Sequence, residues 1–123
     1  EAHEAEHRMN DLNFGDAASQ DIRGAVQYLK ATGSAKVAVT GFCMGGALTI
    51  LSACNVPELD GTVVWYGYPP LEYVDAAAIQ KPMMAHWSMH DEIGKTRFRC
   101  PTDPAASVGQ CQIAGDRLRA LSM

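Results

Sequence analysis

Hydrophobic and polar positions along the first third of the chain predict one clear helix after a polar arm. Residues 1–12 are polar and highly charged, which is typical of a helix end or a loose arm. Residues 16–33 carry apolar positions at the spacing of one helical face, and these are Ile22, Ala25, Val26 and Leu29. Gly33 follows the last of them, so we expect the helix to end there.

Three short apolar runs further along predict strands, with a buried helix between the first two. The runs cover residues 36–40, 61–67 and about 83–87. Residues 44–54 are apolar or small on nearly every side, which predicts a helix buried all round. Strand alternating with helix predicts an α/β fold, a parallel-sheet sandwich of about three strands with flanking helices. The near-continuous apolar first strand is typical of a sheet covered on both faces.

The hydrophobic pattern is lost after residue 92. Residues 93–123 contain two prolines and little periodicity, so we expect an irregular tail without a buried strand. The predicted organisation is therefore a partial α/β domain over residues 1–92 and a divergent tail over residues 93–123. The chain begins with Glu1 rather than Met, which also favours a partial chain.

Composition and charge narrow the classes of function. The chain has 123 residues, 47% of them hydrophobic and 20% charged, and its net charge is −4. These values are ordinary for a soluble domain. The net negative charge does not indicate the basic surface that binds nucleic acid or an anionic membrane. The apolar runs are too short to span a bilayer. We expect a cytoplasmic protein that binds a small molecule and neither nucleic acid nor a membrane.

The cysteines and histidines do not form a metal-binding pattern. Cys43, Cys54, Cys100 and Cys111 lack paired C-x-x-C spacing, and four cysteines are too few to indicate a disulfide scaffold. Cys54 falls near the end of the apolar helix and is expected in the core. The sequence predicts no metal and no cofactor.

The segment "GFCMGG" places a cysteine between a predicted strand and a predicted helix. In a G-x-C-x-G elbow the nucleophile lies on a tight turn, so its neighbours must be small, and Gly41, Gly45 and Gly46 meet that need. The N–H of Met44 would face a developing oxyanion, and the positive helix end favours the thiolate of Cys43. The alternative is a buried cysteine beside packing glycines.

A cysteine nucleophile needs a base, and the base needs an orienting acid. Asp91 follows the third predicted strand and would lie at the carboxyl edge of the sheet, where such sheets place their sites. The alternative is a solvated turn aspartate. His90 is a candidate base next to Asp91, whereas His86 is expected to pack within the strand as a core residue. His3 and His7 lie on the polar arm and are expected at the surface.

With Cys43 and Asp91 placed, the chain resembles the dienelactone hydrolase family (carboxymethylenebutenolidases) of the α/β-hydrolase superfamily. The resemblance covers about residues 16–92 and rests on "KVAVTGFCMGGALTILSA", "GTVVWYGYPP" and "KPMMAHWSMHDE". It implies an incomplete α/β-hydrolase fold, with Cys43 as nucleophile, Asp91 as triad acid and Met44 as a donor to the oxyanion.

The same resemblance implies a reaction. The thiolate would attack the carbonyl of a small ester or lactone, such as an anionic enol-lactone, and water would release the acyl-enzyme. Family members carry further strands before residue 16 and a catalytic histidine after the acid, so this chain would be a part of such a fold.

Two other functions remain open at this point. A glutamine-amidotransferase-like hydrolase also uses a G-x-C-x-G elbow, and "HDE" at residues 90–92 matches the letters of its later H-x-E pair. The other possibility is a non-catalytic hydrolase fragment, in which unpaired sheet edges would favour self-association.

Overall fold

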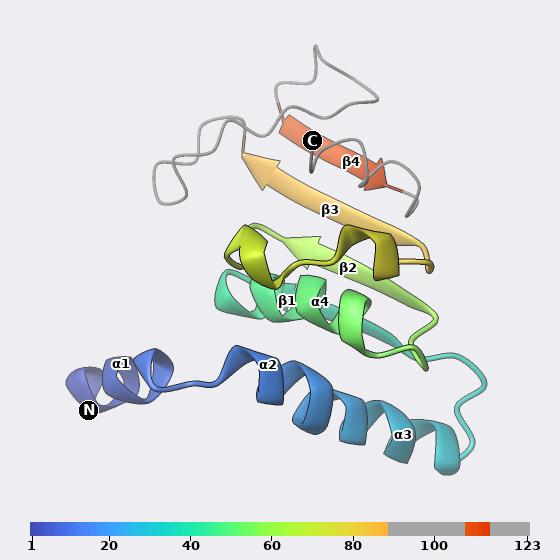
Figure 1. Cartoon of the computed structure of the whole chain (residues 1–123), viewed down its shortest axis with the longest axis horizontal. Helices are drawn as coiled ribbons and strands as arrows, with labels where there is room; N and C mark the ends of the chain where they lie inside the picture. The colour runs from blue at the N-terminus through green and yellow to red at the C-terminus, as the bar shows by residue number, and fades with distance from the viewer. Residues whose placement is uncertain (89–107, 114–123) are drawn as a thin grey trace.

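A four-stranded sheet forms the centre of the protein. The computed structural model describes residues 1–88 and 108–113 (Figure 1). The strands lie in the order β1-β2-β3-β4, and their bounds are β1 (Ala38–Phe42), β2 (Gly61–Trp65), β3 (Met83–Ser88) and β4 (Val108–Ile113). The first three run parallel, which confirms the predicted α/β architecture.

The register brings the carboxyl ends of β1 and β2 to one edge of the sheet. Phe42 pairs with Trp65, and Trp65 in turn pairs with His86 of β3. The connection after β1 therefore begins beside the connection after β2. This shared edge is where ligands bind in open parallel sheets.

Helix α4 (Met44–Asn55) follows β1 and covers one face of the sheet, as Figure 1 shows. Two short 3₁₀-helices, Leu71–Tyr73 and Ala76–Ala78, lie on the same face. The main core cluster on this side consists of Ile50, Val64, Ile79, Met83 and Ala85, each at most 2% exposed. The prediction of a buried helix over residues 44–54 is confirmed.

The helical segment before β1 has four parts. They are α1 (Ala2–Asn10), α2 (Phe14–Asp16), a π-helical stretch Ala17–Ile22 and α3 (Arg23–Ala31). The predicted polar arm is a helix with no buried residue, and the last three parts together form the predicted helix. Within the described residues, no helix is both long and apolar enough to cross a membrane.

The predicted apolar stripe of this segment is only half correct. Val26 is buried and packs with Val37, Val56 and Leu59, and Ile22 packs against them. Ala25 and Leu29 are exposed, Leu29 by 43%. The physical reason is that α3 packs against a narrow region formed by Val37 and the turn after α4. This region covers a single row of α3 side chains.

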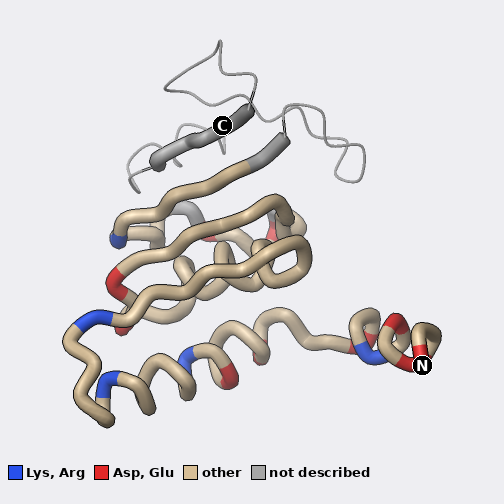
Figure 2. The backbone as a smooth tube through the Cα atoms, turned by 180° about the vertical axis from the view of Figure 1, so that it is seen from behind, with Lys and Arg blue, Asp and Glu red and all other residues tan. Residues whose placement is uncertain are grey.

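The expectation of a sheet covered on both faces is also wrong for the described residues. Along β1 the side chains alternate between half-buried and exposed, and Phe42 is 58% exposed. Trp65 and Met84 are exposed on the neighbouring strands, and Figure 2 shows the strands from this side, with α4 behind them. In the described part of the chain, α4 and the two 3₁₀-helices therefore cover one face of the sheet, and the side chains on the other face are exposed or half-buried along these strands.

The tail, which we predicted to be irregular and without a buried strand, supplies a strand at the edge of the sheet. β4 pairs antiparallel with β3, with Val108 opposite Ser88 and Ile113 opposite Met83. Strand pairing uses backbone groups, so a segment with little hydrophobic pattern can join a sheet edge without a sequence signal. The division at residue 92 stays a prediction, because residues 89–107 lie outside the described part.

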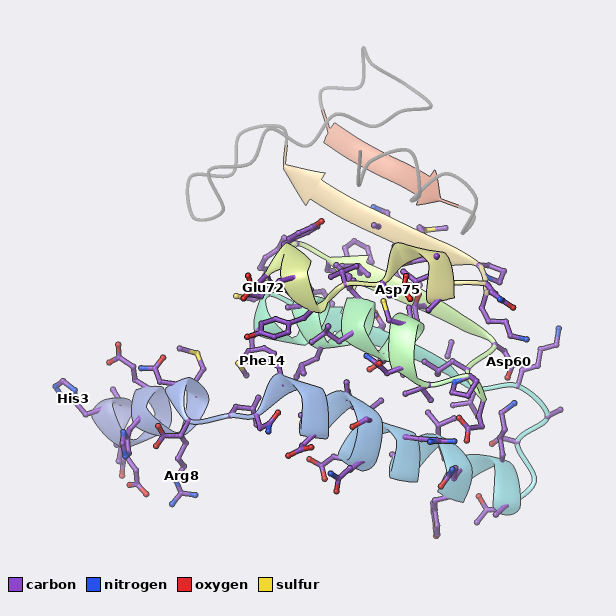
Figure 3. The ribbon with its side chains drawn as sticks, in the orientation of Figure 1. His3, Arg8, Phe14, Asp60, Glu72 and Asp75 are labelled. Carbon is purple, nitrogen blue, oxygen red and sulfur yellow. The ribbon has the colours of Figure 1, made fainter. Side chains whose placement is uncertain are left out.

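Two ion pairs join α3 to the turn between α4 and β2. The Arg23 guanidinium donates to the Glu58 carboxylate at 2.8 Å, and the Lys30 ammonium donates to Asp60 at 2.9 Å. Asp60 also accepts from the Val37 N–H at 2.9 Å. The hydrogen bonds from Lys30 and Val37 hold the pKa of Asp60 below its ordinary value. These contacts lie at the end of the sheet opposite to Glu72, as Figure 3 shows.

Acid is expected to weaken the fold through Glu58. Hydrogen bonds from Arg23 and Gln27 lower the pKa of this carboxyl from 4.5 to about 2. A carboxyl whose pKa is lowered in the folded state stabilises that state above the unfolded pKa, and the contribution is lost as pH falls from about 4.5 toward 2. Urea unfolding should therefore show a shallower loss of stability with acid in Glu58→Gln than in the wild type.

Glu72→Gln is the control for this experiment, because Glu72 is an acid at the other end of the sheet. It should keep the pH dependence of the wild type below pH 5, within about 0.5 kcal/mol as for an ordinary surface substitution. Equal slopes for the wild type and Glu58→Gln would contradict a role for the Arg23 pair.

Candidate active site

Cys43 is the single residue between β1 and α4. Strand β1 ends at Phe42 and α4 begins at Met44, so the chain changes from strand to helix within one residue. Cys43 has φ 54° and ψ −118°, a conformation that costs a non-glycine residue about 1–3 kcal/mol. Its side chain is exposed and makes no capping hydrogen bond. The thiol is thus left available at the carboxyl edge of the sheet.

The backbone of Cys43 is bonded to both neighbouring elements. Its N–H donates to the carbonyl of Trp65 at the end of β2, at 3.1 Å. Its carbonyl accepts from the N–H of Ala47 in the first turn of α4, also at 3.1 Å. Contacts on both sides can hold a residue in a strained conformation, because together they outweigh the free-energy cost of that conformation.

Met44 is the first residue of α4, so its N–H has no partner within the helix. The helix start also carries the positive end of the helix dipole. A backbone donor in this position can stabilise negative charge on an oxygen that forms beside Cys43. The oxyanion role of Met44 stays a prediction.

The elbow glycines differ in what they make room for. A Cβ on Gly41 would overlap the carbonyl of Gly45 and come within 2.7 Å of the Thr49 hydroxyl. A Cβ on Gly46 would lie 2.5 Å from the Tyr66 carbonyl oxygen. A Cβ on Gly45 would meet nothing within 4 Å among the described residues, so the space we predicted beside Cys43 is provided by Gly41.

Sequence reasoning missed the turn after β2. Tyr66 has φ 32° and Gly67 has φ 126°, so two successive residues adopt left-handed conformations. A Cβ on Gly67 would overlap the carbonyl oxygen of Cys43. The available signal was the Tyr-Gly pair at the end of the second predicted strand, because glycine is the usual residue where φ must be positive.

An aromatic row crosses the exposed face of the sheet next to this edge. Phe42 stacks on Trp65 with ring centroids 5.6 Å apart, and Trp65 stacks on His86 at 4.2 Å. The Trp65 indole also donates to the Thr40 hydroxyl at 3.2 Å. His86 therefore packs against a ring on the exposed face, and not in the core as we expected.

The other predicted site residues are placed as follows. His7 of α1 contacts Asp11, the residue after the end of that helix, at 3.3 Å, and Figure 3 shows His3 near the outer end of α1. Asp91 and His90 lie outside the described residues, so their roles as acid and base stay predictions. In the described part of the chain, no three His, Cys, Asp or Glu side chains gather as a metal site would need.

Cys54 differs from Cys43 in its surroundings. It is half-buried and packs against the main core cluster, as predicted. Burial raises the pKa of the Cys54 thiol to about 11, although a backbone hydrogen bond from Asp75 partly opposes the shift. A thiol with so high a pKa is almost wholly protonated near neutral pH and is a poor nucleophile.

Residues 1–102 match the dienelactone hydrolase family. The chain belongs to this family. The match covers most of the chain, including β1, α4 and β2, so the strand–Cys43–helix turn lies within the matched segment. No solved structure matches the chain at a significant level.

Curated relatives support the same assignment. "Protein usf" of Aquifex pyrophilus is 36% identical over 88 residues, which are 71% of this chain and 37% of that protein. A "Putative carboxymethylenebutenolidase" of Saccharolobus solfataricus is 36% identical over 83 residues, 65% of this chain and 32% of the relative. A protein of that name from Aquifex aeolicus is 33% identical over 88 residues, 71% and 37% of the two chains. The chain thus spans about a third of the length of these relatives.

Substitution by alanine should separate the two glycines that flank Cys43. Gly41→Ala is expected to lower the free energy of unfolding by about 1–3 kcal/mol, because its methyl group overlaps the Gly45 carbonyl. Gly45→Ala has open space and a helical position, so stability should stay equal or rise by up to about 1 kcal/mol. Urea denaturation of the two variants measures both values, and equal losses would contradict this geometry.

Iodoacetamide labelling should separate the two described cysteines. Cys43 is exposed at a helix start, whereas the raised pKa and the burial of Cys54 disfavour its thiolate. We expect Cys43 to be alkylated at least about tenfold faster at pH 7.5, measured by peptide-resolved mass spectrometry. Faster labelling of Cys54 would mean that the elbow is not formed in solution.

Proposed function

We propose that this chain carries the nucleophile of an enzyme that hydrolyses small esters or lactones through Cys43. The observation that carries the proposal is the exposed thiol of Cys43, held at φ 54° between β1 and the first turn of α4. Membership of the dienelactone hydrolase family supports a hydrolase, and relatives named carboxymethylenebutenolidase support a lactone as substrate.

The reaction would proceed in two steps. The Cys43 thiolate attacks the carbonyl carbon, and a carbon–sulfur bond forms while the carbonyl oxygen becomes an oxyanion that the Met44 N–H can stabilise. The ester carbon–oxygen bond then breaks, and the leaving alkoxide takes up a proton, which leaves a thioester on Cys43. Water attacks the thioester, releases the carboxylic acid and restores the thiol.

Asp91 and His90 complete the proposal. A base would take the proton of Cys43 and later activate the water, and an acid would orient that base. We assign the acid role to Asp91 and name His90 as a candidate base, on the resemblance and the position of Asp91 after β3. Two of the described histidines have other neighbours, since His7 contacts Asp11 and His86 stacks on Trp65.

The glutamine-amidotransferase alternative is not favoured, because the family match extends through β1, α4, β2 and β3. A non-catalytic fragment remains the outcome to test against. Such a fragment would form no thioester on Cys43, whether or not it binds a ligand.

The proposal predicts that p-nitrophenyl acetate acetylates Cys43. We expect one p-nitrophenolate per chain, a mass increase on the Cys43 peptide and slow turnover afterwards. His90 precedes Asp91 and no histidine follows Asp91 in this chain, and a weakened triad base typically costs several orders of magnitude in rate. Cys43→Ser should lose the rapid thiol acylation, whereas Cys54→Ser should keep it. Acetylation that is unchanged in Cys43→Ser would contradict the proposal.

A further inference from the structure

We propose that Gly67 is a positioning residue for the nucleophile: the left-handed turn at Tyr66 and Gly67 holds the carbonyl of Cys43 and thereby fixes the thiol at the elbow. This inference rests on the proposed function of Cys43 as nucleophile. It concerns a residue in the loop after β2, outside the G-x-C-x-G sequence itself.

The contact between Gly67 and Cys43 carries the argument. A Cβ on Gly67 would overlap the Cys43 carbonyl oxygen, lie 2.7 Å from its carbon and lie 3.2 Å from the Ala47 nitrogen. The same carbonyl accepts the Ala47 N–H at 3.1 Å. The backbone of Gly67 therefore packs directly on the hydrogen bond that begins α4 behind Cys43, and only a residue without a side chain fits there.

The turn itself is anchored to the sheet. The Tyr66 N–H donates to the carbonyl of His86 on β3 at 2.8 Å. The Trp65 carbonyl accepts the Cys43 N–H, and a Cβ on Gly46 would lie 2.5 Å from the Tyr66 carbonyl oxygen. Because β3, the turn and α4 are in such close contact, the turn has little room to move without displacing Cys43.

Cys43 is thus restrained on both sides of its Cα atom. Its N–H is bonded to Trp65, and its carbonyl is enclosed by Ala47 and Gly67. A methyl group at Gly67 would have to move the carbonyl of Cys43 and so rotate the residue that carries the thiol. A misplacement of about 1 Å in a reacting group can lower a rate by about 10²-fold.

The test compares Gly67→Ala with Gly33→Ala. Both glycines have positive φ, 126° and 110°, but a Cβ on Gly33 would meet nothing within 4 Å. The matched pair therefore shares the backbone strain and differs in the contact with Cys43. The readout is the iodoacetamide labelling rate of Cys43 and of Cys54 in the same molecule, measured as a function of pH.

We expect Gly67→Ala to slow the labelling of Cys43 about tenfold or more, with Cys54 unchanged. Gly33→Ala should leave both rates as in the wild type. Equal rates for Cys43 in the two variants would overturn the proposal. So would faster labelling of Cys54 in Gly67→Ala, because that would show general loosening of α4 in place of a local change.

A second pair of variants decides the question if circular dichroism shows that Gly67→Ala does not fold. Tyr66→Asn removes the ring but suits a positive φ, whereas Tyr66→Gly also frees the backbone of the turn. We expect Tyr66→Gly to label Cys43 several-fold more slowly than Tyr66→Asn. Equal rates in this pair would overturn the proposal.

Failure of this inference can be distinguished from failure of the proposed function. If wild-type Cys43 is labelled no faster than Cys54, the elbow nucleophile is contradicted, and Gly67 has nothing to position. If wild-type Cys43 is fast and Gly67→Ala is equally fast, the role of Gly67 alone is overturned.

Discussion

The close approach of α4 to the carboxyl ends of β1 and β2 is the constraint on which the candidate site depends. Three backbones meet within van der Waals distance where Gly41, Gly46 and Gly67 lack side chains. Because they fit together there, Cys43 can occupy a φ of 54° that its own conformational preference opposes. The strained residue carries the exposed thiol that we propose as the nucleophile.

A different set of contacts holds α3 against the rest of the fold. The packing of Val26 on Val37 and Leu59 and the ion pairs of Arg23 and Lys30 join α3 to the turn after α4. Half-exposed pairs of this kind contribute modestly, so the buried apolar clusters carry most of the stability. The carboxyl edge of the sheet can therefore hold a strained turn, because the contacts that stabilise the fold lie in the apolar clusters and at the opposite end of the strands.

Features that depend on residues close together in the chain could be predicted well from the sequence. The strands at β1, β2 and β3 and the buried helix α4 follow from short apolar runs, and Cys43 was found because its glycine spacing is a local signal. The exposure of Leu29 and of the Phe42 face could not be predicted, because it depends on which elements cover a side chain. Strand β4 was missed because its pairing uses backbone groups that every sequence carries.

The sequence by itself determined the order of α3, β1, α4, β2 and β3 along the chain, the position of Cys43 at a strand–helix turn and the family resemblance, since all three depend on short segments of the chain. Only the tertiary structure decided that Gly41 provides room for the Gly45 carbonyl, that Gly67 packs on the carbonyl of Cys43, and that His86 stacks on Trp65. The last two contacts join residues more than 20 positions apart in the chain, so they form only when parallel strands bring their carboxyl ends to one edge.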